Sequence, residues 1–154
     1  MSFKKVRFSI RYVPPSLSRK DKRKQLSMLK NSRLLYKKHK FYTRKKLASF
    51  KSKPSRHVSK AMALYGVDSL IPSKELAKAS GCSIELMEQI VKKGKGAYYS
   101  SGSRPNQTAQ SWAYARLASA LTGGNAAKVD YHLVSQCDKS KPAYRLAQKI
   151  GKIS

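Results

Sequence analysis

"KGAYYSSGSRPNQTAQSWAYAR", residues 95–116, joins two predicted helices through a polar loop and holds the only Trp of the chain. The residue before a proline is excluded from the helical region, so Arg104-Pro105 favours extended backbone. Ser, Thr and Asn side chains in this loop can bond their own backbone. Thr108 is a suitable N-cap for the helix that follows. We expect the aromatic side chains to form a small core and the polar groups to stiffen the connection.

Two short helices are predicted upstream, over "KELAKAS" and "SIELMEQIVKKG", with Gly81 at the turn and Gly94 as a C-cap. This spacing resembles a helix-turn-helix. The second helix, however, would bring Glu85 and Glu88 toward the DNA phosphates, which repel carboxylates. The pattern therefore favours a packed helical hairpin.

Residues that commonly build catalytic or cofactor sites are scattered. Gly94-x-Gly96 lacks a preceding strand and a following Gly-Lys-Ser/Thr, so we expect a helix end and a tight turn there, not a phosphate loop. His39, His57 and His132 lie apart, without a Ser or Cys partner in a recognisable motif. The sequence predicts no catalytic residue, no cofactor and no enzyme activity.

Three further stretches have helical patterns: "TAQSWAYARLASALTGG", "AAKVDYHLVSQ" and "KPAYRLAQKIGK". Together with the hairpin they predict a small helical domain over residues 61–154, with about four or five short helices. The expected fold class is mainly α, with a basic N-terminal arm over residues 1–60 that carries one β-strand.

Charge is the strongest compositional signal. The chain has 154 residues with 34 Lys and Arg against 7 Asp and Glu, a net charge of +27. Residues 1–60 hold 21 of the cations and a single acid, Asp21. Such self-repulsion opposes compaction unless a negative partner supplies counter-charge. Nucleic acid, an acidic protein surface and an anionic lipid surface all remain open as that partner.

The predicted strand covers about residues 4–13, "KKVRFSIRYV", where apolar and polar residues alternate until "PP" follows. A single strand cannot satisfy its own backbone. Its partner is either a weak strand elsewhere in the chain or a sheet edge on another chain. The strand-addition candidates are Val6, Phe8, Ile10 and Tyr12.

Residues 16–60 are basic and permit helices, one of them over "TRKKLASFKSKPS", with Thr43 as N-cap and Pro54 as stop. Aromatic residues alternate with cations here, which suits both anion binding and docking on a surface. We expect this arm to become ordered on its partner. The candidates for partner or anion binding are Arg19, Lys20, Lys22, Arg23, Lys24, Lys37, Lys38, Lys40, Arg44, Lys45 and Lys46 in the arm, with Arg104 and Arg116 in the following domain.

Cys82 and Cys137 are too few for a zinc site, which needs about four ligands, so no metal is predicted. A disulfide stays open, but two reduced thiols in an intracellular protein are favoured. No apolar run reaches the roughly 18–20 residues of a membrane span. The first ten residues do not have the pattern of a secretory signal.

The residues from "SGCSIELMEQIVKKGKGAYYSSGSRPNQTAQSWAYARLASALTGG" to "AAKVDYHL" resemble a family of small basic proteins of large algal DNA viruses (chloroviruses and relatives) and some phages. That family's pattern has a Gly-turned helix pair, a basic-Gly-x-Gly-Ala-aromatic stretch, a Gly-x-Arg-Pro loop and a Trp-x-x-Ala-Arg helix. The matching positions are Gly81, Gly94–Tyr98, Gly102–Thr108, Trp112–Arg116, Gly123–Gly124 and Asp130. Members often have His before Arg-Pro and Gly after it, whereas this chain has Ser103 and Asn106. Any role of that His does not carry over.

The resemblance implies a setting more than a chemistry. With the strand and the basic arm, it predicts a structural virion protein, a minor capsid protein that links capsomers on the inner side of a large icosahedral double-stranded DNA virus. The expected partners are the major capsid protein and neighbouring minor capsid proteins, for a protein made in the host cytoplasm. The alternative is a nucleic-acid-binding protein that condenses viral DNA or binds RNA, and contact with an anionic inner membrane is a third option.

Overall fold

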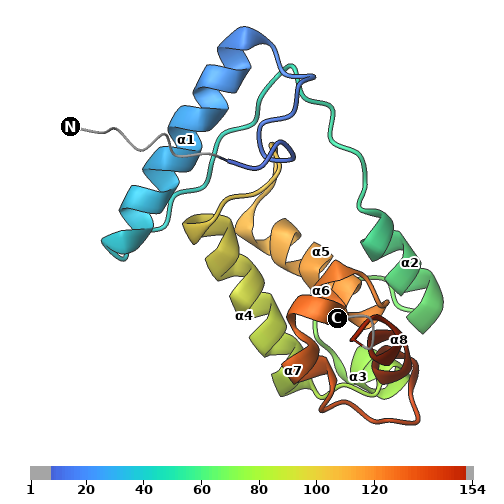
Figure 1. The fold of residues 1–154 in the computed structure, drawn as a ribbon. Coiled ribbons are helices and arrows are strands. Elements are labelled where there is room, and N and C mark those ends of the chain that lie inside the picture. The colour runs from blue at the N-terminus through green and yellow to red at the C-terminus, as the bar shows by residue number, and fades with distance from the viewer. Residues whose placement is uncertain (1–7, 152–154) are drawn as a thin grey trace. The chain divides into compact units, whose positions relative to one another are not determined.

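Helices make up 59% of residues 8–151, the part of the chain that the computed structural model describes (Figure 1). This confirms the mainly α prediction, and within that range there is no strand. None of the helices there combines the length and hydropathy of a bilayer-spanning segment. In chain order the helices are α1 (Arg19–Lys37), α2 (Arg56–Tyr65), α3 (Lys74–Ser80), α4 (Ile84–Ser100), α5 (Ala109–Leu121), α6 (Asn125–Val129), α7 (Tyr131–Val134) and α8 (Pro142–Gly151).

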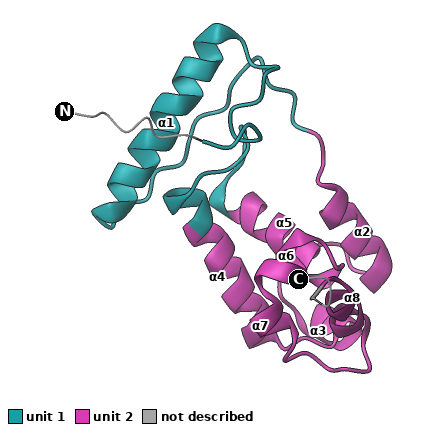
Figure 2. Cartoon of the chain, in the orientation of Figure 1, with its two compact units in different colours: residues 1–52, 97–109 teal, residues 53–96, 110–154 magenta. Residues whose placement is uncertain are grey.

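The chain divides into two compact units, coloured separately in Figure 2. The basic unit comprises residues 1–52 and 97–109, and the helical unit comprises residues 53–96 and 110–154. This division differs from the boundary expected at residue 60. Residues 97–109 comprise the last turn of α4 and the connection to α5, and are called the 97–109 loop below. They group with the basic unit because their polar groups bond to the segment that follows α1.

The helical unit has an apolar core built from its amphipathic helices. Leu76 of α3, Met87 and Ile90 of α4, and Leu117 and Leu121 of α5 are completely buried. The predicted hairpin of α3 and α4 is present. Its first helix begins at the N-cap Ser73 and ends at Gly81, which has left-handed backbone with φ 85°. Local capping signals therefore set these helix ends correctly.

The expected helix end at Gly94 is wrong, because α4 continues through Gly94 and Gly96 to Ser100. Gly94 lies against α5 instead. A Cβ at this position would be 2.7 Å from the Cα of Ala113. The glycine therefore serves a close approach of two helices, a tertiary requirement that the local pattern does not reveal.

The expectation of two reduced thiols is also wrong, since Cys82 and Cys137 form a disulfide with an S–S distance of 2.05 Å. Cys82 follows the α3 turn, and Cys137 follows α7. The amide of Asp138 donates to the carbonyl of Gly81 over 2.8 Å, which brings the two segments together. This long-range bond has no local sequence signal.

In the basic unit, the segment after α1 turns and runs back along that helix. Its residues meet α1 in antiparallel order, as Arg44 bonds to Ser32 and the Lys45 amide contacts the sulfur of Met28 at 3.3 Å. The helix predicted after Thr43 is wrong. Backbone amides of this segment donate to side chains of other elements, and no helix competes successfully with those bonds.

The predicted strand falls partly on residues 4–7, including Val6, which lie outside the described residues. Over residues 8–13 the chain forms a turn, in which the carbonyl of Ser9 accepts from the amides of Tyr12 (2.9 Å) and Val13 (3.2 Å). The Tyr12 carbonyl accepts from the Gln25 side chain over 3.0 Å. These bonds replace the ladder that an extended strand would need.

The described strand-addition candidates have separate surroundings. Phe8 lies under the guanidinium of Arg33, 4.1 Å from ring centroid to Cζ. Ile10 is exposed. Tyr12 lies close to Gly102, where an added Cβ would be 3.2 Å from its ring. Of the candidates that the structure describes, Phe8 and Tyr12 therefore contact other parts of the basic unit, and Ile10 does not.

Candidate polyanion-binding surface

The basic unit contains 19 Lys and Arg residues and one acid, Asp21. That acid lies in the first turn of α1, and its carboxylate accepts a hydrogen bond from the Ser49 amide over 3.0 Å and another from the Ser49 hydroxyl. These hydrogen bonds, the hydroxyl first, lower the pKa of Asp21 below its ordinary value. The unit's only negative side chain is therefore engaged within the fold.

Most of the predicted anion-binding cations lie on two adjoining elements of this unit, α1 and the segment that runs back along it. Lys22 is half-buried. The exposed members are Arg19, Lys20, Arg23, Lys24, Lys37, Lys38, Lys40, Lys45, Lys46 and, from the 97–109 loop, Arg104. The fold therefore gathers eleven of the thirteen candidates as solvent-accessible charge in one unit.

Arg44 is the exception within the basic unit, because its side chain is only 6% exposed. Its Nη1 donates to the Ser32 hydroxyl and to the Tyr98 carbonyl, both over 2.9 Å, and Nη2 donates to the Ser103 hydroxyl over 2.8 Å. The guanidinium carbon lies 3.8 Å from the centroid of the Tyr98 ring. Arg44 is a structural cation and does not face an external anion, contrary to its selection from sequence.

The three oxygens that bond the Arg44 guanidinium are all uncharged. Desolvation by burial lowers the pKa of Arg44. An arginine nevertheless stays protonated in proteins, so a positive charge is held in the interior with hydroxyl, carbonyl and ring partners alone. This arrangement depends on Ser103 and Tyr98, which both belong to residues 95–116.

Asn106 of the same loop fixes the next part of the basic segment. Its Oδ1 accepts from the Leu47 amide over 2.7 Å, and its Nδ2 donates to the carbonyls of Leu47 (3.3 Å) and Phe50 (3.0 Å). Asn106 has left-handed backbone, φ 63°, which Asn tolerates better than most residues. The 97–109 loop is thus a scaffold that holds the lysine-bearing segment in place.

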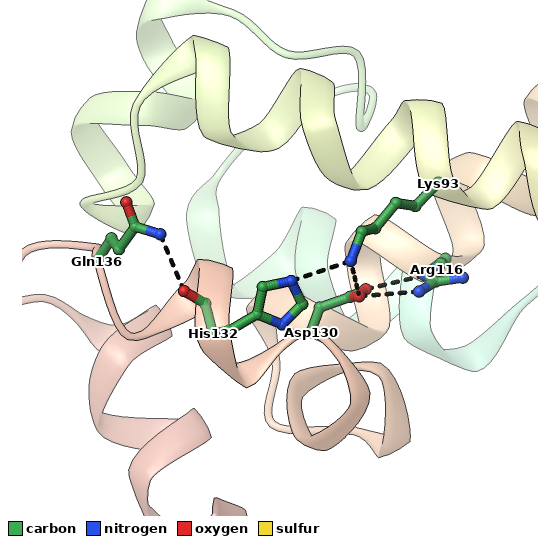
Figure 3. A network of polar contacts seen from close by, with 5 residues as sticks. All are labelled: Lys93, Arg116, Asp130, His132 and Gln136. Atoms are coloured by element: carbon green, nitrogen blue, oxygen red, sulfur yellow. Dashed lines mark hydrogen bonds and ion pairs between the residues drawn. The ribbon is translucent and has the colours of Figure 1, made fainter.

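Arg116 belongs to the helical unit, whereas the other candidates belong to the basic unit. Its Nε and Nη2 each donate to a carboxylate oxygen of Asp130 over 2.8 Å, and the Asp130 side chain is fully buried (Figure 3). Lys93 Nζ is 3.9 Å from the same carboxylate and 2.9 Å from Nε2 of His132. The guanidinium is committed to a bidentate ion pair that ties α5 to the start of α7.

A model of a protein family of unknown function, DUF5824, matches residues 11–140. The chain belongs to the DUF5824 family. The match spans α1, the segment after it, the 97–109 loop and the Arg116 ion pair, so both units of this DUF5824 protein lie largely within the family region. No curated protein and no solved structure matches the chain.

Sequence reasoning overlooked several residues that shape this DUF5824 chain. It placed Tyr36 and Phe41 among cations but did not bring Tyr99 to them. It also missed Asp130 as the partner of Arg116 and Asn106 as the anchor of Leu47. Each of these contacts joins residues that are separated in sequence. Only Asp130 had a signal in the sequence, because acids are rare in so basic a chain.

One shallow hollow of about 350 Å³ lies along α1 of the DUF5824 chain. It is lined by Ser27, Met28, Lys30, Asn31, Leu34 and Tyr42. These side chains offer one cation and no acid. Elsewhere in residues 8–151, no three His, Cys, Asp or Glu side chains gather as metal ligands would.

Proposed function

We propose that this protein is a non-enzymatic nucleic-acid-binding protein whose basic unit binds the phosphate backbone. The observation that carries the proposal is the charge of that unit, 19 cations against one acid that is already engaged by Ser49. Phosphate contacts from Lys and Arg supply most of the sequence-independent affinity for nucleic acid. The cations on α1 and on the adjoining segment offer such contacts together.

Binding should depend strongly on salt, because each phosphate neutralised by a cation releases condensed counterions. We expect the logarithm of the association constant to fall linearly with the logarithm of the NaCl concentration. The slope is roughly −0.9 per phosphate contact for duplex DNA and roughly −0.7 for a single strand. Fluorescence anisotropy with the full chain and labelled 20-mers over a salt series measures it.

Paired variants locate the contacts. Lys45→Gln with Lys46→Gln removes two exposed charges from the basic unit, and Lys92→Gln with Lys139→Gln removes two exposed charges from the helical unit. The first pair is expected to make the salt slope shallower by about two, and the second to leave it nearly unchanged. Equal changes of the salt slope for both pairs of variants would show that the basic unit is not the binding element.

A structural role in a virus particle is the second candidate. Its support is the Gly102–Asn106 loop and the Trp112–Arg116 helix, which carry the resemblance to proteins of large DNA viruses. Large exposed apolar side chains in the basic unit, Ile10, Leu34 and Phe41, add contact area for a protein partner. On this proposal the protein is a minor capsid protein on the inner side of the shell, next to the major capsid protein.

Fractionation of purified particles tests the second candidate. Retention of the protein in shells depleted of DNA supports a capsid partner. Loss of the protein with the DNA core supports nucleic-acid binding, and loss with lipid supports contact with an anionic membrane. A protein absent from every fraction has no virion role.

A further inference from the structure

Three aromatic rings of the basic unit pack together at the C-terminal end of α1. The Phe41 and Tyr99 ring centroids are 4.9 Å apart at an interplanar angle of 34°. Tyr36 lies 6.3 Å from both of the other rings, nearly parallel to Tyr99 at 12°. We call Tyr36, Phe41 and Tyr99 the aromatic platform. Its members come from α1, from the following segment and from α4, so the platform exists only in the folded unit.

Phe41 is the exposed member of the platform. Its side chain is 70% exposed, while Tyr36 and Tyr99 are half-buried. Both tyrosine rings contact the Phe41 ring, which still keeps most of its surface accessible to solvent. Binding to a fixed ring costs less conformational entropy than binding to a free one.

The backbone turn after α1 sets the position of Phe41. The amides of Lys38 and Lys40 both donate to the carbonyl of Leu35, over 3.0 and 2.8 Å. The amide of His39 donates to the backbone carbonyl of Tyr36 over 2.9 Å. His39 has left-handed backbone with φ 59°. This reversal closes the helix and returns Phe41 toward the last turn, where Tyr36 lies.

The surroundings of the platform are cationic. Lys37, Lys38 and Lys40 are exposed in the same turn. Asp21, the unit's only acid, is fifteen residues before Tyr36 on α1, which is about 22 Å of helix. The C-terminal end of a helix carries partial negative charge of about half a unit, which three lysines outweigh.

We propose that the aromatic platform is a stacking site for an unpaired base of single-stranded nucleic acid, with Lys37, Lys38 and Lys40 contacting the flanking phosphates. This inference rests on the proposed function and specifies its ligand. Non-specific single-strand binders combine aromatic side chains, on which bases stack, with cations that contact the phosphate backbone. Bases inside a duplex are already stacked on each other and do not reach such a ring.

The test compares labelled oligothymidine 20-mers with a 20-base-pair duplex, using the full chain and fluorescence anisotropy at one salt concentration. Phe41→Ala is expected to weaken single-strand binding roughly tenfold, the loss of one stacked base, and to leave duplex binding within about twofold. Leu64→Ala is the matched control, since Leu64 is a large apolar side chain of α2, in the helical unit, that is 46% exposed. We expect this control to bind both ligands like the wild type.

Phe41→Trp keeps a stacking ring and guards against a folding defect in Phe41→Ala. We expect it to retain single-strand affinity, and the fluorescence of the introduced tryptophan to be quenched on adding oligothymidine. Failure of Phe41→Ala to change single-strand binding, or equal losses for both nucleic acids, would overturn the platform as a base site while leaving phosphate binding by the unit intact.

Two further outcomes are separated by the same proteins. A wild-type chain that binds neither oligonucleotide refutes the proposed function itself. Vesicles of phosphatidylserine and phosphatidylcholine provide the membrane arm. If Phe41→Ala loses vesicle binding but keeps oligothymidine binding, the platform is a lipid contact and the base-stacking proposal is wrong.

Discussion

Arg44 holds a positive charge among neutral oxygens in the interior of the basic unit. Removing that side chain leaves the Tyr98 carbonyl and the hydroxyls of Ser32 and Ser103 with one donor fewer each. Removal also relieves the cost of burying an ion, which partly offsets the loss. Because the oxygens stay buried, we expect the lost bonds to outweigh this relief.

We therefore predict that Arg44→Met destabilises the basic unit by about 2 kcal/mol. Hydrogen exchange at the Leu47 amide should accelerate roughly thirtyfold if that amide exchanges through opening of this unit. Lys45→Met, at the exposed neighbouring position, serves as the control and should change stability by less than about 0.5 kcal/mol. Unchanged protection in Arg44→Met would contradict a structural role for the guanidinium.

Asp21 gives the basic unit a pH dependence. Its folded pKa is lowered by the hydrogen bonds from Ser49, so the ionised carboxylate favours the folded state. That contribution is complete above the unfolded pKa, near 3.8, and is lost as the pH falls below it toward the folded pKa. We predict that the Ser49 amide resonance titrates with a midpoint below the ordinary Asp value. In Asp21→Asn this titration should vanish, and a midpoint at or above 3.8 would show that the bond does not favour the anion.

Single residues show why part of the site was predictable. The exposed lysines followed from composition, because so many cations cannot be buried. The burial of Arg44 could not be predicted, since its partners Ser32 and Ser103 are 12 and 59 residues away in the sequence. Arg116 was expected at the surface, because its pairing with Asp130 joins α5 to the start of α7 and has no local sequence signal.

Among the helices, α4 depends most on a tertiary contact. At Gly94 an alanine has a helix propensity advantage of about 1 kcal/mol. Its Cβ would, however, lie 2.7 Å from the backbone of Ala113 in α5, and backbone cannot move aside as a flexible side chain does. Overpacking of this kind costs about 1–3 kcal/mol. We therefore expect the cost of the close contact to exceed the gain in helix propensity.

We predict that Gly94→Ala destabilises the helical unit by about 1 kcal/mol, measured by urea unfolding with the fluorescence of Trp112 in α5. Lys92→Ala, an exposed position of the same helix, should be neutral within about 0.5 kcal/mol. A more stable Gly94→Ala protein would mean that α4 and α5 have room to separate.

Helices with local start and stop signals were predictable, as the Ser73 cap and the Gly81 end of α3 illustrate. Elements that depend on distant partners were not. The segment after Thr43 has helical composition, yet its amides at Arg44 and Leu47 bond to Tyr98 and Asn106. Local propensity is weak where long-range hydrogen bonds use the same groups.

At the scale of the whole molecule, the disulfide links only segments of the helical unit. It closes a loop with a sequence separation of 55, and cross-links of that length stabilise by about 4 kcal/mol. We predict that dithiothreitol lowers the free energy of unfolding of the helical unit by about 4 kcal/mol. Urea unfolding with the fluorescence of Trp112 measures this change. Amides of the Arg44–Phe50 segment should keep their protection.

The double variant Cys82→Ser with Cys137→Ser is the control for this experiment and should not respond to the reductant. Alkylation under denaturing conditions without reductant is expected to label no thiol in the wild type. Two labelled cysteines would show that the bridge does not form.

The discontinuous basic unit has a consequence for how the chain is synthesised. Translation proceeds from the N-terminus, so the cationic residues of α1 and of the next segment emerge long before Tyr98, Ser103 and Asn106, the residues that hold Arg44 and Leu47. Until residue 109 has left the ribosome, this part of the nascent chain lacks its scaffold. A fragment that stops at residue 60 never gains these residues, so its basic segment lacks the hydrogen bonds that hold Arg44 and Leu47.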